Sequence, residues 1–267
     1  MTGRAGGDIF LATMFTQIVW LLTRALARGI FAATGGLRVK GAERVPRRGG
    51  VLLCPNHVSD ADPAAVLAAL PRAGHYMAKE ELFAVPVLGR LLRLWGAFPV
   101  RRDSADRAAL RRAEALLKAG ETVVIFPEGG GNPEGRLQPL HPGAMLVALR
   151  TQGVPVIPVA LENTREVWPY GAPRPRRAGV AVRVTFGEPL DLSDLYGKKG
   201  GAAEEATRRL AGRLAEMLDQ PLPEGRPKNR TAEEEAARNG SAALQQQQQQ
   251  GVSRPVYAAG AAESERG

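Results

Sequence analysis

Between Gly36 and about Pro221, short apolar runs of strand length alternate with longer segments whose apolar residues recur at helical spacing. Strands separated by helices in this way favour a layered α/β domain, with a mainly parallel sheet flanked by helices. The expected strands are Val51–Cys54, His75–Ala78, Ala97–Arg101, Thr122–Phe126, Val154–Leu161 and Val180–Phe186, and the expected helices are Pro63–Leu70, Leu82–Trp95, Ala105–Ala119, Gly143–Gln152 and Ala202–Asp219.

Composition divides the 267 residues into three parts. Residues 36–222 hold the alternating pattern, which is long enough for one sizeable core. Residues 223–267 are charged, rich in Ala and Gly, and include the run Gln245–Gln250. Few side chains there could bury a core, so we expect a disordered tail. Residues 1–35 form a separate N-terminal segment.

The N-terminal segment has the pattern of a surface helix. Residues 9–23 carry no formal charge and are followed by Arg24 and Arg28. This stretch is too short for a spanning helix, which needs about 20 apolar residues. The pattern predicts an amphipathic helix in the membrane interface, or alternatively a helix packed on the domain. Its apolar side would hold Phe10, Met14, Ile18, Leu21, Leu22 and Ala25, and its polar side Thr13, Thr16, Gln17, Arg24 and Arg28.

The formal net charge of +9 favours anionic partners. Phosphorylated substrates and an anionic membrane surface fit best, since no compact basic motif with interleaved aromatic residues indicates nucleic acid. The only cysteine, Cys54, lies within an expected buried strand, where a core role is favoured over a nucleophile. A chain without disulfides suits a reducing cytoplasm. The expected location is therefore the cytoplasmic face of the cell membrane, as a peripheral or monotopic protein.

The loop between the first expected strand and helix contains a candidate general base, His57, five residues before Asp62. Asp62 stands at the expected N-cap, and Pro63 at the first helical position. Across such a turn the two side chains can meet. A carboxylate that receives one imidazole N–H leaves the other ring nitrogen free to accept a proton. The alternatives are that Asp62 only caps the helix and that His57 is an ordinary loop histidine.

Two further polar segments follow expected strands. One runs from Gly96 to Arg102, and the other is Phe126-Pro127-Glu128-Gly129-Gly130-Gly131. Ligands of open α/β sheets collect at the carboxyl ends of the strands, where His57, Arg102 and Glu128 would all lie. Each residue has a plainer explanation, because arginines at strand ends are usually solvated and a Glu before glycines usually marks a turn.

Taken together and in order, these blocks resemble the glycerolipid acyltransferase family, above all the 1-acyl-glycerol-3-phosphate acyltransferases. The family pattern is N-H-x-x-x-x-D, then G-x-x-F/P-x-x-R, then F-P-E-G-T-R-S, then an apolar V-P-[IV]-x-P-V strand. The resemblance covers roughly Gly36 to Leu218. The matching blocks here are Asn56-His57…Asp62, Gly96…Arg102, Phe126-Pro127-Glu128-Gly129 and Val154…Pro158-Val159.

The resemblance implies roles for these residues. His57, oriented by Asp62, would be the general base on the hydroxyl of a lysophospholipid acceptor, and the co-substrate would be acyl-CoA or acyl-carrier protein. It implies no metal and no tightly bound cofactor. The residues that would bind substrate are Lys79, Arg102, Glu128, Gly129, Gly130 and Arg136.

The third block departs from the family, because Gly130-Gly131-Asn132 stands where Thr-Arg-Ser is usual. The family's arginine is associated with the acceptor phosphate. Arg136 could supply that charge, the Gly130 and Gly131 amides could form an anion-binding nest, or the acceptor could carry another head group. Two other classes stay open, namely an acyl-thioester hydrolase and a lipid-binding protein without catalysis.

Overall fold

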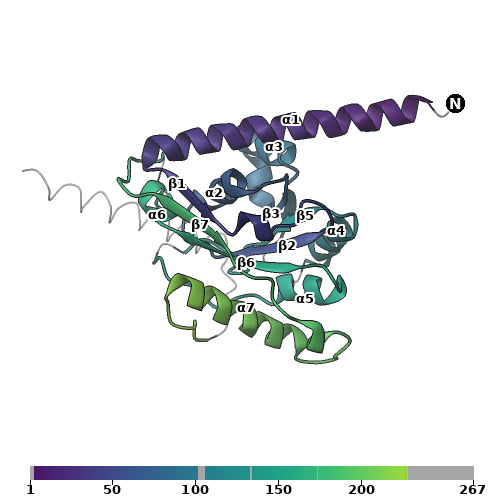
Figure 1. Cartoon of the computed structure of the whole chain (residues 1–267), viewed down its shortest axis with the longest axis vertical. Helices are drawn as coiled ribbons and strands as arrows, with labels where there is room; N and C mark the ends of the chain where they lie inside the picture. The colour runs from purple at the N-terminus through teal and green to yellow at the C-terminus, as the bar shows by residue number, and fades with distance from the viewer. Residues whose placement is uncertain (1–2, 102–105, 133, 173, 226, 228–267) are drawn as a thin grey trace, which may run out of the picture.

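The computed structural model describes residues 3–101, 106–132, 134–172, 174–225 and 227. Its centre is a seven-stranded sheet in the order β1-β7-β6-β2-β5-β3-β4 (Figure 1). Neighbouring strands are parallel except β6 and β7, which are antiparallel. The strands are β1 Leu37–Lys40, β2 Val51–Pro55, β3 His75–Lys79, β4 Phe98–Val100, β5 Thr122–Val124, β6 Val156–Glu162 and β7 Val182–Phe186.

Helices pack on both faces of the sheet. In Figure 1, α1, α2 and α3 lie above the sheet, and α5 and α7 lie below it. Three short 3-10 segments complete the described structure. The helices are α1 Gly3–Thr34, α2 Asp62–Ala69, α3 Pro86–Leu94, α4 Arg107–Lys118, α5 Gly143–Arg150, α6 Thr164–Val167 and α7 Ala202–Leu218, and the 3-10 segments are η1 Ala42–Arg44, η2 Glu80–Ala84 and η3 Ser193–Leu195.

The central strand β2 contributes side chains to both hydrophobic cores. Leu52 and Cys54 join the core formed with α4, α5 and α7, whereas Val51 and Leu53 join the core formed with α1 and α2. Side chains alternate between the faces of a strand, so a strand covered on both faces needs a continuous apolar run. Burying one such Leu or Val side chain contributes roughly 1.5–3 kcal/mol.

The predicted α/β fold with a mainly parallel sheet is confirmed. Strand β1 was missed, because its four residues are largely exposed at the sheet edge and lack a buried apolar run. The helix expected over 82–95 is instead η2 followed by α3, which begins at Pro86. Proline cannot donate a helical hydrogen bond but suits the first turn, so it starts a new helix there.

The N-terminal segment is one helix, α1, whose C-terminal part packs on the domain. Trp20, Ala27 and Phe31 are buried in the core shared with α2, and the Arg28 guanidinium donates to the Ala68 carbonyl. No helix in the described ranges has the length and hydrophobicity needed to cross a membrane. Most of the predicted tail, residues 226 and 228–267, lies outside the described residues. From residue 17 onward, where the side chains of α1 are described, the exposed large apolar ones are Ile18, Leu21, Leu22, Leu26 and Ile30.

Candidate active site

The predicted site residues gather where parallel strands end. His57 follows β2, Lys79 ends β3 and Glu128 follows β5. Strands β2, β3, β5 and β6 run in the same direction, so their carboxyl ends share one edge of the sheet. The segment after β6, which includes α6, reaches the same edge. The topology therefore brings together residues that are up to about a hundred positions apart in the chain.

His57 and Asp62 are bonded to each other. The Nδ1 atom of His57 lies 2.9 Å from Oδ2 of Asp62, whose side chain is fully buried. The same oxygen accepts the backbone N–H groups of Val58 at 2.6 Å and Ser59 at 2.8 Å. Three donors on one oxygen hold the carboxylate in a single position. The bond occupies Nδ1, so Nε2 is the nitrogen left to accept a proton.

The predicted N-cap role of Asp62 is wrong. Helix α2 begins at Asp62 itself, and Ala61 occupies the N-cap position without a side-chain cap. The Asp62 carboxylate turns back toward the loop that precedes the helix, where His57, Val58 and Ser59 supply the donors. The plainer explanation of Asp62 as a helix cap therefore does not hold in this structure.

Aromatic rings flank the His57 imidazole. The Phe126 ring lies with its centroid 4.4 Å away and is tilted by 36°, and the Tyr170 ring lies edge-on at 6.5 Å. Only 16% of the His57 side chain remains exposed. A partly dehydrated base next to an apolar ring suits acid–base work, because few water molecules compete for its free nitrogen.

Glu128 holds the backbone of the His57 loop. Its buried carboxylate accepts the N–H of His57 at 2.7 Å and the N–H of Gln138 at 3.2 Å. The His57 carbonyl in turn accepts the N–H of Asn132 at 2.9 Å. These contacts go to backbone groups, so they position the loop that carries His57. Contact of Glu128 with an acceptor stays a prediction.

Two polar residues that the sequence did not single out as functional anchor the same loop. The Asn56 side chain donates to the Leu161 carbonyl at 3.1 Å and accepts the Leu161 N–H at 2.7 Å, so it joins the loop to β6. The Ser59 hydroxyl contacts the carbonyls of Thr164 and Trp168 in the segment after β6. Asn56 is part of the N-H-x-x-x-x-D motif, so the motif could have indicated its importance. Ser59 is at an unspecified position of that motif, so the sequence did not indicate it.

Lys79, at the end of β3, is half-buried. Burial raises the pKa of the Asp60 carboxyl, and this outweighs the lowering by the Gly171 N–H and by the charges of His57 and Lys79. The Oδ2 atom of Asp60 accepts the N–H of Gly171 at 2.9 Å, which is a second tie between the loop and the segment after β6.

The glycines of the third block are enclosed. Gly129 has a φ of +72°, and a Cβ there would lie 2.8 Å from the His141 ring. Gly130 is buried, and a Cβ on Gly131 would overlap the Tyr170 ring. An arginine at position 131 therefore has no room while Tyr170 keeps this position.

Of the two predicted arginines, the structure describes only Arg136. Arg102 lies outside the described residues, and its neighbour Arg101 is exposed beside Glu80, with Nε 3.6 Å from Oε2. Arg136 is exposed, and its carbonyl accepts the Asn132 side chain at 2.6 Å. One arginine was not predicted. A Cβ on Gly135 would lie 2.9 Å from Nη1 of Arg165, so this α6 residue reaches the same loop as Arg136.

Cys54 belongs to the core, as predicted. It is fully buried, and burial raises the pKa of its thiol well above the ordinary value. A thiol that stays protonated is a poor nucleophile. Among the described residues, no three His, Cys, Asp or Glu side chains are grouped so that they could hold a metal ion.

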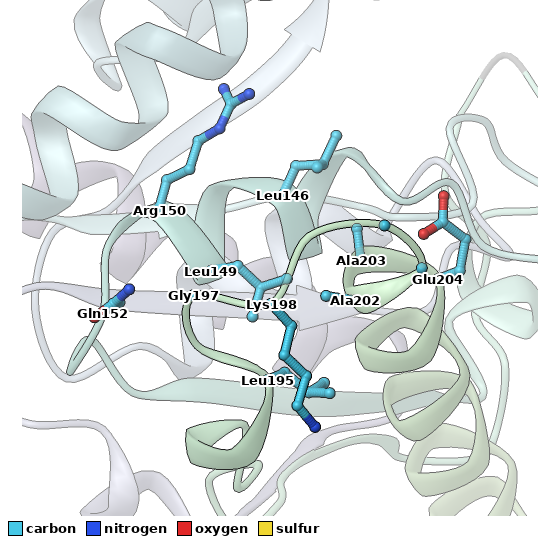
Figure 2. Close-up of a pocket in the computed structure, with 12 residues that line it drawn as sticks. Leu146, Leu149, Arg150, Gln152, Leu195, Gly197, Lys198, Ala202, Ala203 and Glu204 are labelled. Atoms are coloured by element: carbon cyan, nitrogen blue, oxygen red, sulfur yellow. The ribbon is translucent and has the colours of Figure 1, made fainter.

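An open pocket lies away from His57 (Figure 2). It is formed between the end of α5 and the segment leading into α7, close to the residues that precede β6. Its two most prominent cations have partners elsewhere, since Arg150 pairs with Glu114 and Lys198 lies 3.9 Å from Asp194. The pocket shares no residue with the loop from His57 to Asp62, so it does not describe the site above.

The chain is similar in sequence to known acyltransferases. A family model described as acyltransferase matches residues 36–162. The 1-acyl-sn-glycerol-3-phosphate acyltransferase of Bacillus subtilis is 31% identical over 199 residues, which are 72% of this chain and 94% of that protein. A chloroplast enzyme of the same name from Brassica napus is 32% identical over 177 residues, which are 65% of this chain. This alignment spans 49% of the plant protein, so the match covers about half the plant relative's length.

The fold is also similar to a solved structure. The crystal structure of the 1-acyl-sn-glycerophosphate (LPA) acyltransferase PlsC from Thermotoga maritima superposes with a TM-score of 0.64. The match covers 80% of this chain and 88% of that one, at 22% sequence identity. At this identity the match shows a common fold.

Proposed function

The chain belongs to the acyltransferase family of the 1-acyl-sn-glycerol-3-phosphate acyltransferases, and from this premise we propose that it makes phosphatidic acid for phospholipid biosynthesis. The acceptor is the free hydroxyl of 1-acyl-glycerol-3-phosphate, and the donor is the thioester of acyl-CoA or acyl-carrier protein. The observation that carries the proposal is the 2.9 Å bond from His57 Nδ1 to the buried Asp62 carboxylate, which leaves Nε2 as the proton acceptor.

In the proposed reaction, Nε2 of His57 takes the proton from the acceptor hydroxyl as its oxygen attacks the thioester carbonyl. Asp62 keeps the ring oriented and stabilises the imidazolium that forms. The tetrahedral intermediate then expels the thiolate, which takes the proton back from His57. The acyl–oxygen bond has replaced the acyl–sulfur bond, and the base is restored. A positioned base contributes about 10²–10⁴-fold, so holding both substrates together must supply the rest.

Direct transfer without an acyl-enzyme fits the nucleophiles of this chain. Cys54 is buried, and the raised pKa of its thiol keeps it neutral. The sequence has no G-x-S-x-G elbow that would present a serine. We therefore assign the attack to the acceptor hydroxyl.

The proposed place of the reaction is an anionic membrane surface, with the protein peripheral or monotopic on its cytoplasmic side. Helix α1 turns Leu22 and Leu26 outward, each 65% exposed. Helix α3 lies on the same side of the sheet as α1 in Figure 1, and its Val87 is 79% exposed. Apolar side chains on the outside of a surface helix favour the membrane interface, where the lipid acceptor and product reside.

The test uses purified full-length protein with radiolabelled acyl-CoA or acyl-carrier protein and a panel of lysolipids. Labelled phosphatidic acid from lysophosphatidic acid is the expected product, and His57→Ala should abolish it. The matched control is His75→Ala, since His75 is a half-buried histidine whose Nδ1 contacts the Gly96 carbonyl. Free fatty acid instead would indicate a hydrolase. A labelled diacyl phospholipid formed only from another lysolipid would indicate a different acceptor, and no product would indicate a binding protein. Each of these outcomes would refute the assignment to phosphatidic acid.

A further inference from the structure

Tyr170 stands at the rim of the catalytic base without a role in the reaction described above. It comes from the segment after α6, more than a hundred residues from His57. Its ring meets the His57 ring edge-on, with centroids 6.5 Å apart at 75°. The same ring covers Gly131, where a Cβ would overlap it. Tyr170 therefore touches both the base and the third block.

The segment that carries Tyr170 is hydrogen-bonded to the loop from His57 to Asp62 both before and after Tyr170. Before it, the Thr164 and Trp168 carbonyls accept the Ser59 hydroxyl. After it, the Gly171 N–H donates to Asp60. The Trp168 indole also donates to the Ala172 carbonyl at 2.8 Å and closes the segment on itself. These hydrogen bonds fix the position of the Tyr170 ring relative to His57.

The surroundings of His57 leave few directions for the acceptor. Asp62 occupies Nδ1, and Phe126 lies 4.4 Å from the imidazole. The acceptor hydroxyl has to reach Nε2, and the Tyr170 ring lies beside the same imidazole, nearly perpendicular to it. A rigid aromatic wall at this point limits the size of the group attached to that hydroxyl.

We infer that Tyr170, lying on Gly131, forms a wall of the acceptor subsite and determines which head groups can be acylated. The inference rests on the proposed function and deepens it. Gly131 is the matching partner, because a side chain at that position and the Tyr170 ring exclude each other. The acceptor head group is then contacted here by the Tyr170 ring, and not by a side chain at position 131.

The variants Tyr170→Ala, Tyr170→Phe, Gly131→Ala and Gly131→Ala with Tyr170→Ala separate a wall from simple packing. Each is assayed for kcat and KM with lysophosphatidic acid and with lysophosphatidylethanolamine, whose head group is larger. Tyr196→Ala is the matched control. Tyr196 is also a half-buried tyrosine, but it packs on the core formed with α5 and α7.

We expect Tyr170→Ala to raise KM for lysophosphatidic acid about tenfold, with kcat and KM for the donor nearly unchanged. The ratio of kcat/KM for the larger acceptor over lysophosphatidic acid should rise by about the same factor. Tyr170→Phe should keep the acceptor ratio of the wild type, because it keeps the ring. Gly131→Ala should lose activity and thermal stability, and in the double variant Tyr170→Ala should bring both back to the level of the Tyr170→Ala single variant.

The results that would overturn the inference differ from those that would overturn the proposed function. If the wild type uses lysophosphatidic acid and Tyr170→Ala keeps its KM and its acceptor ratio, the inference is overturned and the proposed function stands. The same holds if Gly131→Ala behaves like the wild type. If the wild type transfers no acyl group to any lysolipid, the proposed function is overturned, and the inference falls with it.

Discussion

At the residue scale, the site depends on one carboxylate oxygen with three donors. Oδ2 of Asp62 meets the His57 ring and two backbone N–H groups while fully buried. This buried carboxylate fixes the geometry of the loop through the Val58 and Ser59 N–H groups, and in the proposed reaction it also orients the His57 ring. Changing it affects both, and the two effects can be separated by comparing conservative substitutions.

Asp62→Asn should lower acyl transfer on the order of 10²–10⁴-fold, because the amide no longer favours the His57 tautomer with its proton on Nδ1. The protein should still fold, since the amide oxygen can keep part of the backbone contacts. Single-turnover kinetics with a saturating acceptor measures the first effect, and thermal unfolding measures the second. Wild-type turnover in a folded Asp62→Asn variant would refute the role of the pair.

Arg136→Ala and Arg165→Ala test where the acceptor phosphate is bound. Position 131 has no side chain, and these two arginines reach the same loop from different segments. Loss of a charge-assisted contact costs roughly 1.5–3 kcal/mol, so KM for lysophosphatidic acid should rise about ten- to a hundredfold. KM for the acyl donor should not change. Arg150→Ala is the control, because that arginine pairs with Glu114 away from the site. Silent variants at both positions would remove them from phosphate binding.

At the scale of elements, the sequence predicted what periodicity and strand-end position encode. The central strands were found because burial on both faces demands apolar runs. His57, Arg102 and Glu128 were predicted at one edge because parallel strands end there, and the structure places His57 and Glu128 at that edge, while Arg102 lies outside the described residues.

Tyr170 and Arg165 could not be found in this way. Tyr170 lies beside His57 and Arg165 beside Gly135. Both belong to residues 163–181 between β6 and β7, and no local sequence pattern specifies the path of that segment.

The outward face of α1 gives a prediction about membrane binding. The double change Leu22→Gln and Leu26→Gln should reduce flotation with anionic vesicles several-fold, because it removes two exposed apolar side chains while Trp20 and Phe31 stay in the core. Leu222→Gln changes a leucine that is 51% exposed elsewhere and serves as the control. Deleting residues 1–35 is a poorer test, since it would uncover the core under α1. Unchanged flotation of the double variant would refute this contact.

Asp106 is the N-cap residue of α4, and its contacts predict a pH effect on stability. Its carboxylate accepts the N–H groups of Arg101, Ala109 and Ala108, which lower the pKa of Asp106. A lowered pKa in the folded state adds stability that is present above the unfolded pKa and is lost as pH falls through the folded one. Asp106→Ala should cost about 1 kcal/mol at pH 7.

Asp106→Asn is the matched control, because it keeps a capping oxygen without the titrating charge. Urea unfolding between pH 2 and pH 7 should show the Asp106→Ala deficit shrinking as the medium becomes acidic. A deficit that stays constant across that range would refute the electrostatic part of this prediction.

At the scale of the molecule, the net charge predicts how binding to a bilayer depends on lipid charge and salt. The formal net charge is +9, and exposed charges are screened within about 8 Å at physiological salt. Binding to anionic vesicles should therefore exceed binding to neutral ones and should weaken as salt rises from 0.05 to about 0.5 M. Cosedimentation at several salt concentrations measures this. Equal binding to both lipids at low salt would leave apolar contact as the only attraction.

The antiparallel pairing of β6 and β7 has an evolutionary consequence. Two antiparallel neighbours can be joined by as few as two residues, yet residues 163–181 connect these strands. Insertions, deletions and exchanges within such an excursion leave the register of the sheet untouched. After gene duplication, copies of this enzyme could diverge in the lipids they accept by changes around Tyr170 that keep the contacts to Ser59 and Asp60, while His57 and Asp62 are inherited unchanged.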